Sequence, residues 1–202
     1  MPASFYNEVF LEGGSELNYK KHWKETPWNA VWQYIVDYLK KEGKTKILDL
    51  GCGPGQAAGC LYEGGIKFYT GIDFSEVAIN IAKQNFIKNY KESKNYKFIC
   101  KDLLKYDFNQ EQYDAVISTE FLEHIKEDIF VLNKIRKNTL TIITLPNCDS
   151  EGHVRYFPQK NEDDAKIEIK NRYSKHFNIL KIDTYNYPAS TSKDYIIIML
   201  KK

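Results

Sequence analysis

The stretch Ile47-Leu-Asp-Leu-Gly-Cys-Gly-Pro-Gly55 joins a short apolar run directly to a turn that is rich in glycine. The apolar residues of the run are typical of a parallel strand that is covered on both faces. Gly51, Gly53 and Gly55 lack the side chains that would keep a ligand away from the backbone. Ligands of open α/β sheets bind just outside the carboxyl ends of the strands. We therefore interpret this strand, its turn and a helix expected at residues 56–63 as a cofactor pocket.

Two phosphate-binding motifs do not fit this turn. The dinucleotide fingerprint needs a third glycine where Gln56 stands, and the Gly-Lys-Ser/Thr of a phosphate loop is absent. A second segment, Gly71-Ile-Asp-Phe-Ser75, follows at the end of the next expected strand. With both segments in this order, the chain resembles a class I S-adenosylmethionine-dependent methyltransferase over roughly residues 45–200. The resemblance implies methyl transfer from S-adenosylmethionine, with S-adenosylhomocysteine as the product.

Expected strands alternate with expected helices along the chain, and this pattern favours an α/β fold with a parallel sheet. Helices are expected to begin at the cap Thr26-Pro27, after Ser75, after the fourth strand and near residue 159. The resemblance implies a Rossmann-like, seven-stranded, mostly parallel sheet with a C-terminal antiparallel hairpin and helices on both faces. Strands are expected at residues 47–50, 68–73, 96–100, 113–118, 140–145, 177–185 and 195–200.

A chain of 202 residues with 43% hydrophobic content can bury the core of one domain. We expect a single class I methyltransferase domain over residues 1–202, with an N-terminal lid and helix at 1–43 and the Rossmann-like core at 44–202. Tyr19, His22 and Trp23 precede the first expected helix cap. We expect Tyr19 and Trp23 to contact the substrate if this segment closes over the pocket, and His22 is a candidate base.

The formal charge of +2 is spread along the chain, so we expect a small-molecule substrate and no nucleic-acid partner. The four cysteines are widely spaced without a Cys-x-x-Cys pair, which indicates reduced thiols. The first residues lack the basic start and apolar run of a signal peptide, and the sequence has no apolar stretch long enough for a membrane-spanning helix. We expect a cytoplasmic protein without membrane association, as a monomer or homodimer.

The resemblance also implies roles for acidic residues at the strand ends. Asp73 would accept hydrogen bonds from both ribose hydroxyls, Asp102 would take the adenine amino group, and Asp49 would reach the amino-acid end of the cofactor. The alternatives are that Asp73 caps the following helix and that Asp102 only orders a turn. The full set expected to contact the cofactor is Asp49, Gly51, Cys52, Gly53, Gly55, Asp73, Phe74, Asp102, Leu103 and Glu120.

The segment Ser118-Thr-Glu-Phe-Leu-Glu-His-Ile125 follows the fourth expected strand. It resembles the Glu-x-Leu-Glu-His signature of small-molecule methyltransferases related to quinone biosynthesis. If residues 120–124 are helical, Glu120, Glu123 and His124 share one face. His124 could then be the general base. Alternatively, these three residues and His153 could bind a divalent metal, and a third interpretation is that they only brace the helix start.

The segment after the fifth strand supplies His153 and Arg155, which could meet an anionic or hydroxyl-bearing acceptor; Arg155 could equally be a surface charge. The catalytic candidates are thus His124, Glu120, His153 and His22. The sequence favours O-methylation of a small polar acceptor such as a sugar, a phosphorylated metabolite or a capsule or other surface-polysaccharide precursor. Metal-assisted RNA 2′-O-methylation and a non-catalytic cofactor-binding subunit are the alternatives. The RNA-terminus enzymes use a similar Glu-x-x-Glu-His with a downstream histidine pair, where this chain offers one histidine.

Overall fold

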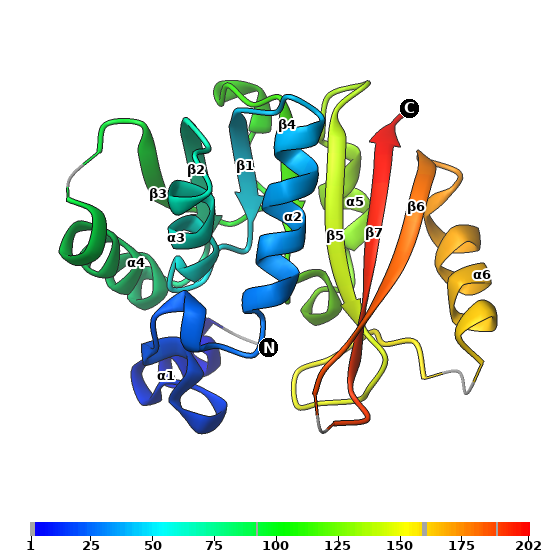
Figure 1. Cartoon of the computed structure of the whole chain (residues 1–202), viewed down its shortest axis with the longest axis horizontal. Helices are drawn as coiled ribbons and strands as arrows, with labels where there is room; N and C mark the ends of the chain where they lie inside the picture. The colour runs from blue at the N-terminus through cyan, green and yellow to red at the C-terminus, as the bar shows by residue number, and fades with distance from the viewer. Residues whose placement is uncertain (1–2, 92, 159–160, 189) are drawn as a thin grey trace. The chain divides into compact units, whose positions relative to one another are not determined.

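The computed structural model describes residues 3–91, 93–158, 161–188 and 190–202, and Figure 1 shows its helices and strands. The chain divides into two compact units, residues 1–115 and 116–202. The described residues form a seven-stranded sheet with the order β3-β2-β1-β4-β5-β7-β6. This order, with parallel strands first and antiparallel strands last, confirms the predicted α/β class and the seven-stranded mixed sheet.

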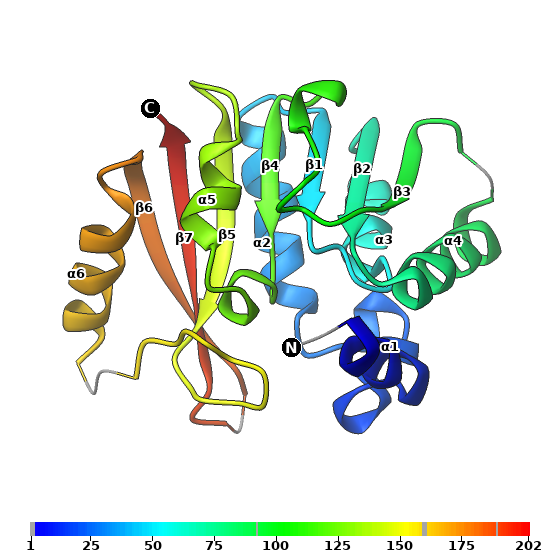
Figure 2. The ribbon, with the colours of Figure 1, turned by 180° about the vertical axis from the view of Figure 1, so that it is seen from behind.

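The first unit contains a parallel three-stranded segment with the order β3-β2-β1. Helix α4 packs against α1, α3 and two of these strands, as can be followed from both sides in Figures 1 and 2. The elements of this unit are α1 (Ala3–Glu12), α2 (Asn29–Lys41), β1 (Lys46–Leu50), α3 (Gln56–Glu63), β2 (Phe68–Asp73), α4 (Glu76–Tyr90) and β3 (Tyr96–Cys100), with 3₁₀ turns η1 (Ser15–Lys20), η2 (Trp23–Glu25) and η3 (Phe108–Gln110).

The second unit ends in the antiparallel hairpin that the sequence predicts. Strand β7 pairs with β5 on one side and with β6 on the other, and a bulge interrupts the β6 register between Ile179 and Lys181. Helix α6 packs against β6. The elements are β4 (Ala115–Ser118), η4 (Leu122–His124), α5 (Asp128–Asn133), β5 (Leu140–Pro146), α6 (Glu162–Tyr173), β6 (Phe177–Asn186) and β7 (Lys193–Lys201).

Helix α2 begins two residues after the predicted Pro27, so the prediction of a Thr26 cap is wrong. The Thr26 hydroxyl donates to the Trp23 carbonyl, 2.8 Å away, and closes the preceding 3₁₀ turn. That turn has its own cap, because the His22 ring accepts from the Lys24 amide and the Glu25 carboxylate accepts from the His22 amide. The apolar face predicted for this helix is confirmed, since its residues at 31, 32, 35, 36 and 39 are all buried.

Gly55 has a packing role in addition to its place in the glycine turn. Its φ angle of +78° lies in the left-handed region, which residues with a Cβ adopt only with strain. A Cβ added there would also lie 2.8 Å from the Ala82 Cβ and 3.0 Å from the Phe98 ring. Gly55 therefore lets the start of α3 approach α4 and β3 closely.

Replacing Gly55 by alanine should destabilise the protein more than Gly43→Ala does. Gly43 also has a positive φ, +66°, but an added Cβ there would meet nothing within 4 Å. Gly43→Ala thus reports only the backbone strain, about 1 kcal/mol, whereas Gly55→Ala adds an overpacking cost of about 1–3 kcal/mol. Chemical denaturation of both variants measures the difference. Equal free energies of unfolding would contradict the packing role.

Candidate functional site

Asp73, at the end of β2, holds two separate backbone segments of the first unit in place. One carboxylate oxygen accepts from the Gly53 amide at 3.0 Å, and the other accepts from the Ser75 amide at 2.9 Å. The side chain is 4% exposed. Burial raises the pKa of Asp73, while hydrogen bonds from the backbone amides of Ser75, Gly53 and Phe74 oppose that rise. Each carboxylate oxygen can accept more than one hydrogen bond, so the group retains capacity for two ligand hydroxyls.

The glycine turn is held by hydrogen bonds to β2, and Gly53 within it has few neighbouring atoms. The amides of Gly51 and Cys52 both donate to the Ile72 carbonyl, at 2.8 and 3.1 Å. Gly53 has a φ angle of +50°, and a Cβ added there would meet only the Phe10 ring within 4 Å, at 3.6 Å. The turn beside a buried carboxylate therefore has the features that a nucleoside ligand needs, namely an approachable backbone and an acceptor for hydroxyls.

Asp49, next to the last residue of β1, carries a second buried carboxyl. One of its oxygens accepts from the Tyr69 hydroxyl at 2.7 Å, and within the described part of the chain the other oxygen has no hydrogen-bond partner. Burial raises the pKa of Asp49 to about 7; the Tyr69 hydrogen bond opposes the shift and the charge of Asp73 adds to it. The free oxygen fits the predicted contact with the amino-acid end of the cofactor. The role of Tyr69 has no signal in the sequence beyond its place in an expected strand.

Helix α1 lies against this turn, a placement that the sequence did not reveal beyond the general expectation of a lid. The Ser75 hydroxyl donates to the Asn7 side-chain oxygen at 2.6 Å. The Tyr6 and Phe74 rings meet edge to face at 5.5 Å, and Phe10 is the neighbour of Gly53. The N-terminal segment thus contacts the residues on both sides of Asp73.

Asp102 forms a turn after β3, as its alternative interpretation predicts. Its carboxylate accepts from the Leu104 amide at 2.9 Å and lies 3.6 Å from the Lys105 ammonium. Its side chain is 42% exposed, and the adjacent Leu103 is buried. A turn aspartate can still accept from a ligand amine through its second oxygen, so the adenine contact of Asp102 and Leu103 stays a prediction.

His22 and Trp23 belong to a hydrogen-bonded group at the end of α3. The Trp23 indole and the Tyr90 hydroxyl both donate to the Glu63 carboxylate, at 3.0 and 2.9 Å. The His22 Nε2 atom lies 3.0 Å from the Tyr90 hydroxyl. Tyr19 stacks on Trp28 with ring centroids 5.8 Å apart. These contacts fasten the N-terminal segment to the first unit, and the substrate and base roles of these residues remain predictions.

In the second unit, residues 120–124 do not form the helix that would place Glu120, Glu123 and His124 on one face. Glu120 has a φ angle of +53°, and only a 3₁₀ turn follows, at Leu122–His124. The Glu120 carboxyl accepts from the Thr144 hydroxyl at 3.2 Å and shares a hydrogen bond with Asp194. Burial, followed by the charges of Asp194 and Glu123, raises the pKa of Glu120. The sequence did not single out Asp194, because its partner Glu120 is far away in the chain.

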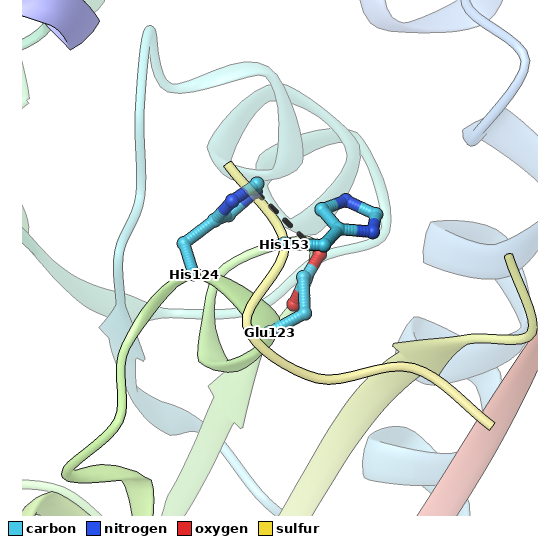
Figure 3. Close-up of side chains that lie close together, drawn as sticks. All are labelled: Glu123, His124 and His153. Carbon is cyan, nitrogen blue, oxygen red and sulfur yellow. Dashed lines mark ion pairs between the residues drawn. The ribbon is translucent and has the colours of Figure 1, made fainter. Parts of the chain in front are cut away.

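Glu123, His124 and His153 come together where the segments after β4 and β5 meet (Figure 3). The two imidazole centroids are 4.9 Å apart, and the His124 Nε2 atom lies 3.8 Å from a Glu123 oxygen. Burial raises the pKa of Glu123 to about 8. Burial also lowers the pKa of His124 to about 4, so its ring is neutral at pH 7.

Arg155 has a structural network around its guanidinium. It pairs with Asp128 at 3.0 Å and donates to the carbonyl oxygens of Leu122, Ile125 and Lys126. Its side chain is 11% exposed, so it is not the plain surface charge that the sequence left open. This network fixes the loop that carries Glu123 and His124. A direct contact of Arg155 with an acceptor stays a prediction.

Comparison with known proteins identifies the family. The family model described as "Methyltransferase domain" matches residues 41–195, which is most of the chain. The chain belongs to this family. The prediction of a class I S-adenosylmethionine-dependent methyltransferase, made from the motifs at 47–55 and 71–75, is therefore confirmed, and S-adenosylmethionine is the implied cofactor. Asp73, the glycine turn and Asp49 fit that cofactor by the geometry above.

The curated relatives agree at the level of the family. The chain is 27% identical over 117 residues to the ubiquinone biosynthesis O-methyltransferase of Stutzerimonas stutzeri, covering 58% of this chain and 48% of the relative. It is 33% identical over 88 residues to the ribosomal protein L11 methyltransferase of Staphylococcus haemolyticus, covering 44% of this chain and 27% of the relative. The chain thus spans about half or less of the length of these relatives.

Solved structures share the fold at low sequence identity. The [4+2]-cyclase SpnF aligns with a TM-score of 0.71 and 16% identity, covering 98% of this chain and 95% of SpnF. The N-methyltransferase NodS of Bradyrhizobium japonicum WM9, solved with S-adenosylhomocysteine, aligns with a TM-score of 0.70 and 12% identity, covering 98% of this chain and 97% of NodS. In the part of the chain that the structure describes, no helix combines the length and apolar character needed to cross a membrane.

Asp49→Asn should flatten the pH dependence of stability. A carboxyl whose pKa is raised in the folded state contributes stability below the unfolded pKa of 3.8, and this contribution is lost as the pH rises through about 7. A pKa that differs by one between the folded and unfolded states changes the free energy of unfolding by about 1.4 kcal/mol. Melting temperatures measured without ligand from pH 4 to pH 8 should therefore fall less in Asp49→Asn than in the wild type. If the melting temperatures of Asp49→Asn and of the wild type fall equally between pH 4 and pH 8, a raised pKa at Asp49 is contradicted.

Proposed function

We propose that this enzyme transfers the methyl group of S-adenosylmethionine to a hydroxyl oxygen of a small polar acceptor. A sugar, a phosphorylated metabolite or a surface-polysaccharide precursor fits this description. The observation that carries the proposal is the cluster Glu123, His124 and His153, which places two imidazoles and a carboxyl within one small volume. Such a group can withdraw the proton from a hydroxyl, which is the step that an oxygen acceptor needs at neutral pH.

The position of the cluster supports this role. It lies in the segments that follow β4 and β5, and ligands of this fold class bind beyond the carboxyl ends of such strands. The sulfonium of the cofactor already activates the methyl carbon, so the protein mainly has to align the acceptor oxygen and exclude water. Relatives named as O-methyltransferases favour oxygen as the methylated atom.

The first unit supplies the proposed cofactor contacts. Asp73 would accept from the ribose hydroxyls, the Gly53 backbone would lie against the ligand, and the free oxygen of Asp49 would receive its ammonium group. Helix α1 would act as a lid, because Asn7 and Phe10 already contact residues on both sides of Asp73.

Asp73→Asn should weaken S-adenosylhomocysteine binding by about tenfold or more. The amide nitrogen of asparagine cannot accept the hydrogen bond from Gly53 or Ser75, and one acceptor for a ribose hydroxyl is lost. Isothermal titration measures the dissociation constant, and Asp107→Asn, a turn aspartate with one backbone contact elsewhere in the unit, is the control. Unchanged affinity in Asp73→Asn would remove Asp73 from the cofactor site.

Replacing His124 or His153 by glutamine should lower kcat by about 10²–10⁴ with little change in S-adenosylhomocysteine affinity, because the cluster acts on the acceptor. His176→Gln, at a half-buried histidine of the same unit that lies outside the cluster, should keep full activity. The readout is S-adenosylhomocysteine release with a panel of sugars, phosphorylated metabolites and a short RNA. Turnover on the RNA alone, or equal kcat in all three variants, would overturn the proposed acceptor class or the role of the cluster.

A further inference from the structure

The three side chains of the cluster are brought together from two separate loops. Glu123 and His124 belong to the 3₁₀ turn after β4, whereas His153 follows β5, as Figure 3 shows. One ligand atom of each residue lies within 4.8 Å of the others. A hydrogen bond from the Val154 amide to the Glu123 carbonyl, 2.7 Å long, joins the two loops beside the cluster.

Both histidines are held in the tautomer that suits a metal ligand. The His124 Nδ1 atom lies 3.2 Å from the Gly152 carbonyl, and the His153 Nδ1 atom lies 3.1 Å from the Cys148 carbonyl. A carbonyl oxygen can only accept, so each Nδ1 must carry the proton. In the neutral form of either ring, the lone pair is then on Nε2. A backbone carbonyl that orients the far nitrogen in this way is the usual outer-shell partner of a metal-binding histidine.

Glu123 is buried without a hydrogen bond to its carboxyl group from the described residues, and the His124 ring lies 3.8 Å from one of its oxygens. The residue is 1% exposed, and neither side-chain oxygen accepts a hydrogen bond from any residue that the structure describes. The Arg155 guanidinium is engaged by Asp128 and by three backbone carbonyls. A buried carboxyl in this condition is costly for the fold, and a bound cation would compensate for that cost.

We propose that Glu123, His124 and His153 bind one divalent first-row transition-metal ion through the Glu123 carboxylate and the two Nε2 atoms. Two imidazoles and one carboxylate suit manganese, iron, cobalt or zinc, whereas magnesium and calcium prefer oxygen ligands throughout. Ligand atoms around such an ion stand roughly 3–4 Å apart, so small side-chain rotations from the present geometry suffice. Glu120 stays outside the ligand set, because Thr144 and Asp194 hold its carboxyl.

The role of the ion rests on the proposed function, but its binding does not. Three protein ligands leave further coordination positions open, which is the arrangement of catalytic metal sites. A dication at this place would lower the pKa of the acceptor hydroxyl. The two histidines then act as ligands, and neither has to serve as the base.

The test is a titration of the metal-stripped protein with Mn²⁺, followed by the electron paramagnetic resonance signal of the free ion. We expect one ion per chain in the wild type and at least about tenfold weaker binding in Glu123→Gln and in His153→Gln. His176→Gln and Glu162→Gln are matched controls on the same unit and should bind as the wild type does. Co²⁺ added to the wild type should show visible absorption bands that differ from those of the aqueous ion, and Glu123→Gln should lose them.

Absence of Mn²⁺ and Co²⁺ binding to the wild type, or equal affinity in the wild type and both ligand variants, would overturn the metal site. Circular dichroism of each variant verifies that its fold is retained. S-adenosylhomocysteine binding is titrated on the same samples. Cofactor binding without metal binding would refute the metal site alone, whereas metal binding without methyl transfer to any hydroxyl acceptor would refute the proposed function alone.

Discussion

The carboxylate of Asp73 is the contact on which the first unit depends. Its two oxygens accept from Gly53, in the turn after β1, and from Ser75, which caps α4. One side chain at the end of β2 therefore fixes the path of the chain after two adjacent strands. Helix α1 then rests on the same region through Asn7 and Ser75. Because the Gly53 amide is held by the Asp73 carboxylate and the Gly51 and Cys52 amides are held by the Ile72 carbonyl, the loop can be rich in glycine without losing its shape.

The second unit uses buried carboxyl groups differently. Glu123 and Asp194 are buried, Glu120 is half-buried, and burial raises the pKa of each. Asp128 shows what a buried carboxylate needs in this protein, since it is paired with Arg155 and Arg172 and accepts from Tyr173. Glu123 has no comparable partner in the described chain. Desolvated acids without compensation occur in proteins mainly where they bind or react, and this supports placing the proposed chemistry at Glu123.

The sequence predicted most of the fold because its signals are local. Helix α3 and strands β2 and β3 have the predicted bounds, and Ser75 caps α4 as expected. The sequence is less informative where the conformation depends on a contact with a residue that no local pattern identifies. Thr26 closes the turn of η2 and does not start α2. The helical condition that would place Glu120, Glu123 and His124 on one face is not met, and Thr144 and Asp194 hold the Glu120 carboxyl. The pairing of Asp49 with Tyr69 depends on the alignment of β1 with β2, which no local pattern contains.

The contrast between local signals and long-range contacts also explains why the sequence says least about the identity of the methyl acceptor. The fold is shared at similar TM-scores by a protein titled as a [4+2]-cyclase and by an N-methyltransferase, so the sheet does not specify the reaction. What differs between such proteins must lie in the loops beyond the strands. Here the loops after β4 and β5 carry two histidines whose tautomers are set by the Gly152 and Cys148 carbonyls. Since backbone atoms decide which nitrogen carries the proton, the chemistry of the site follows from the loop path as much as from the residue types.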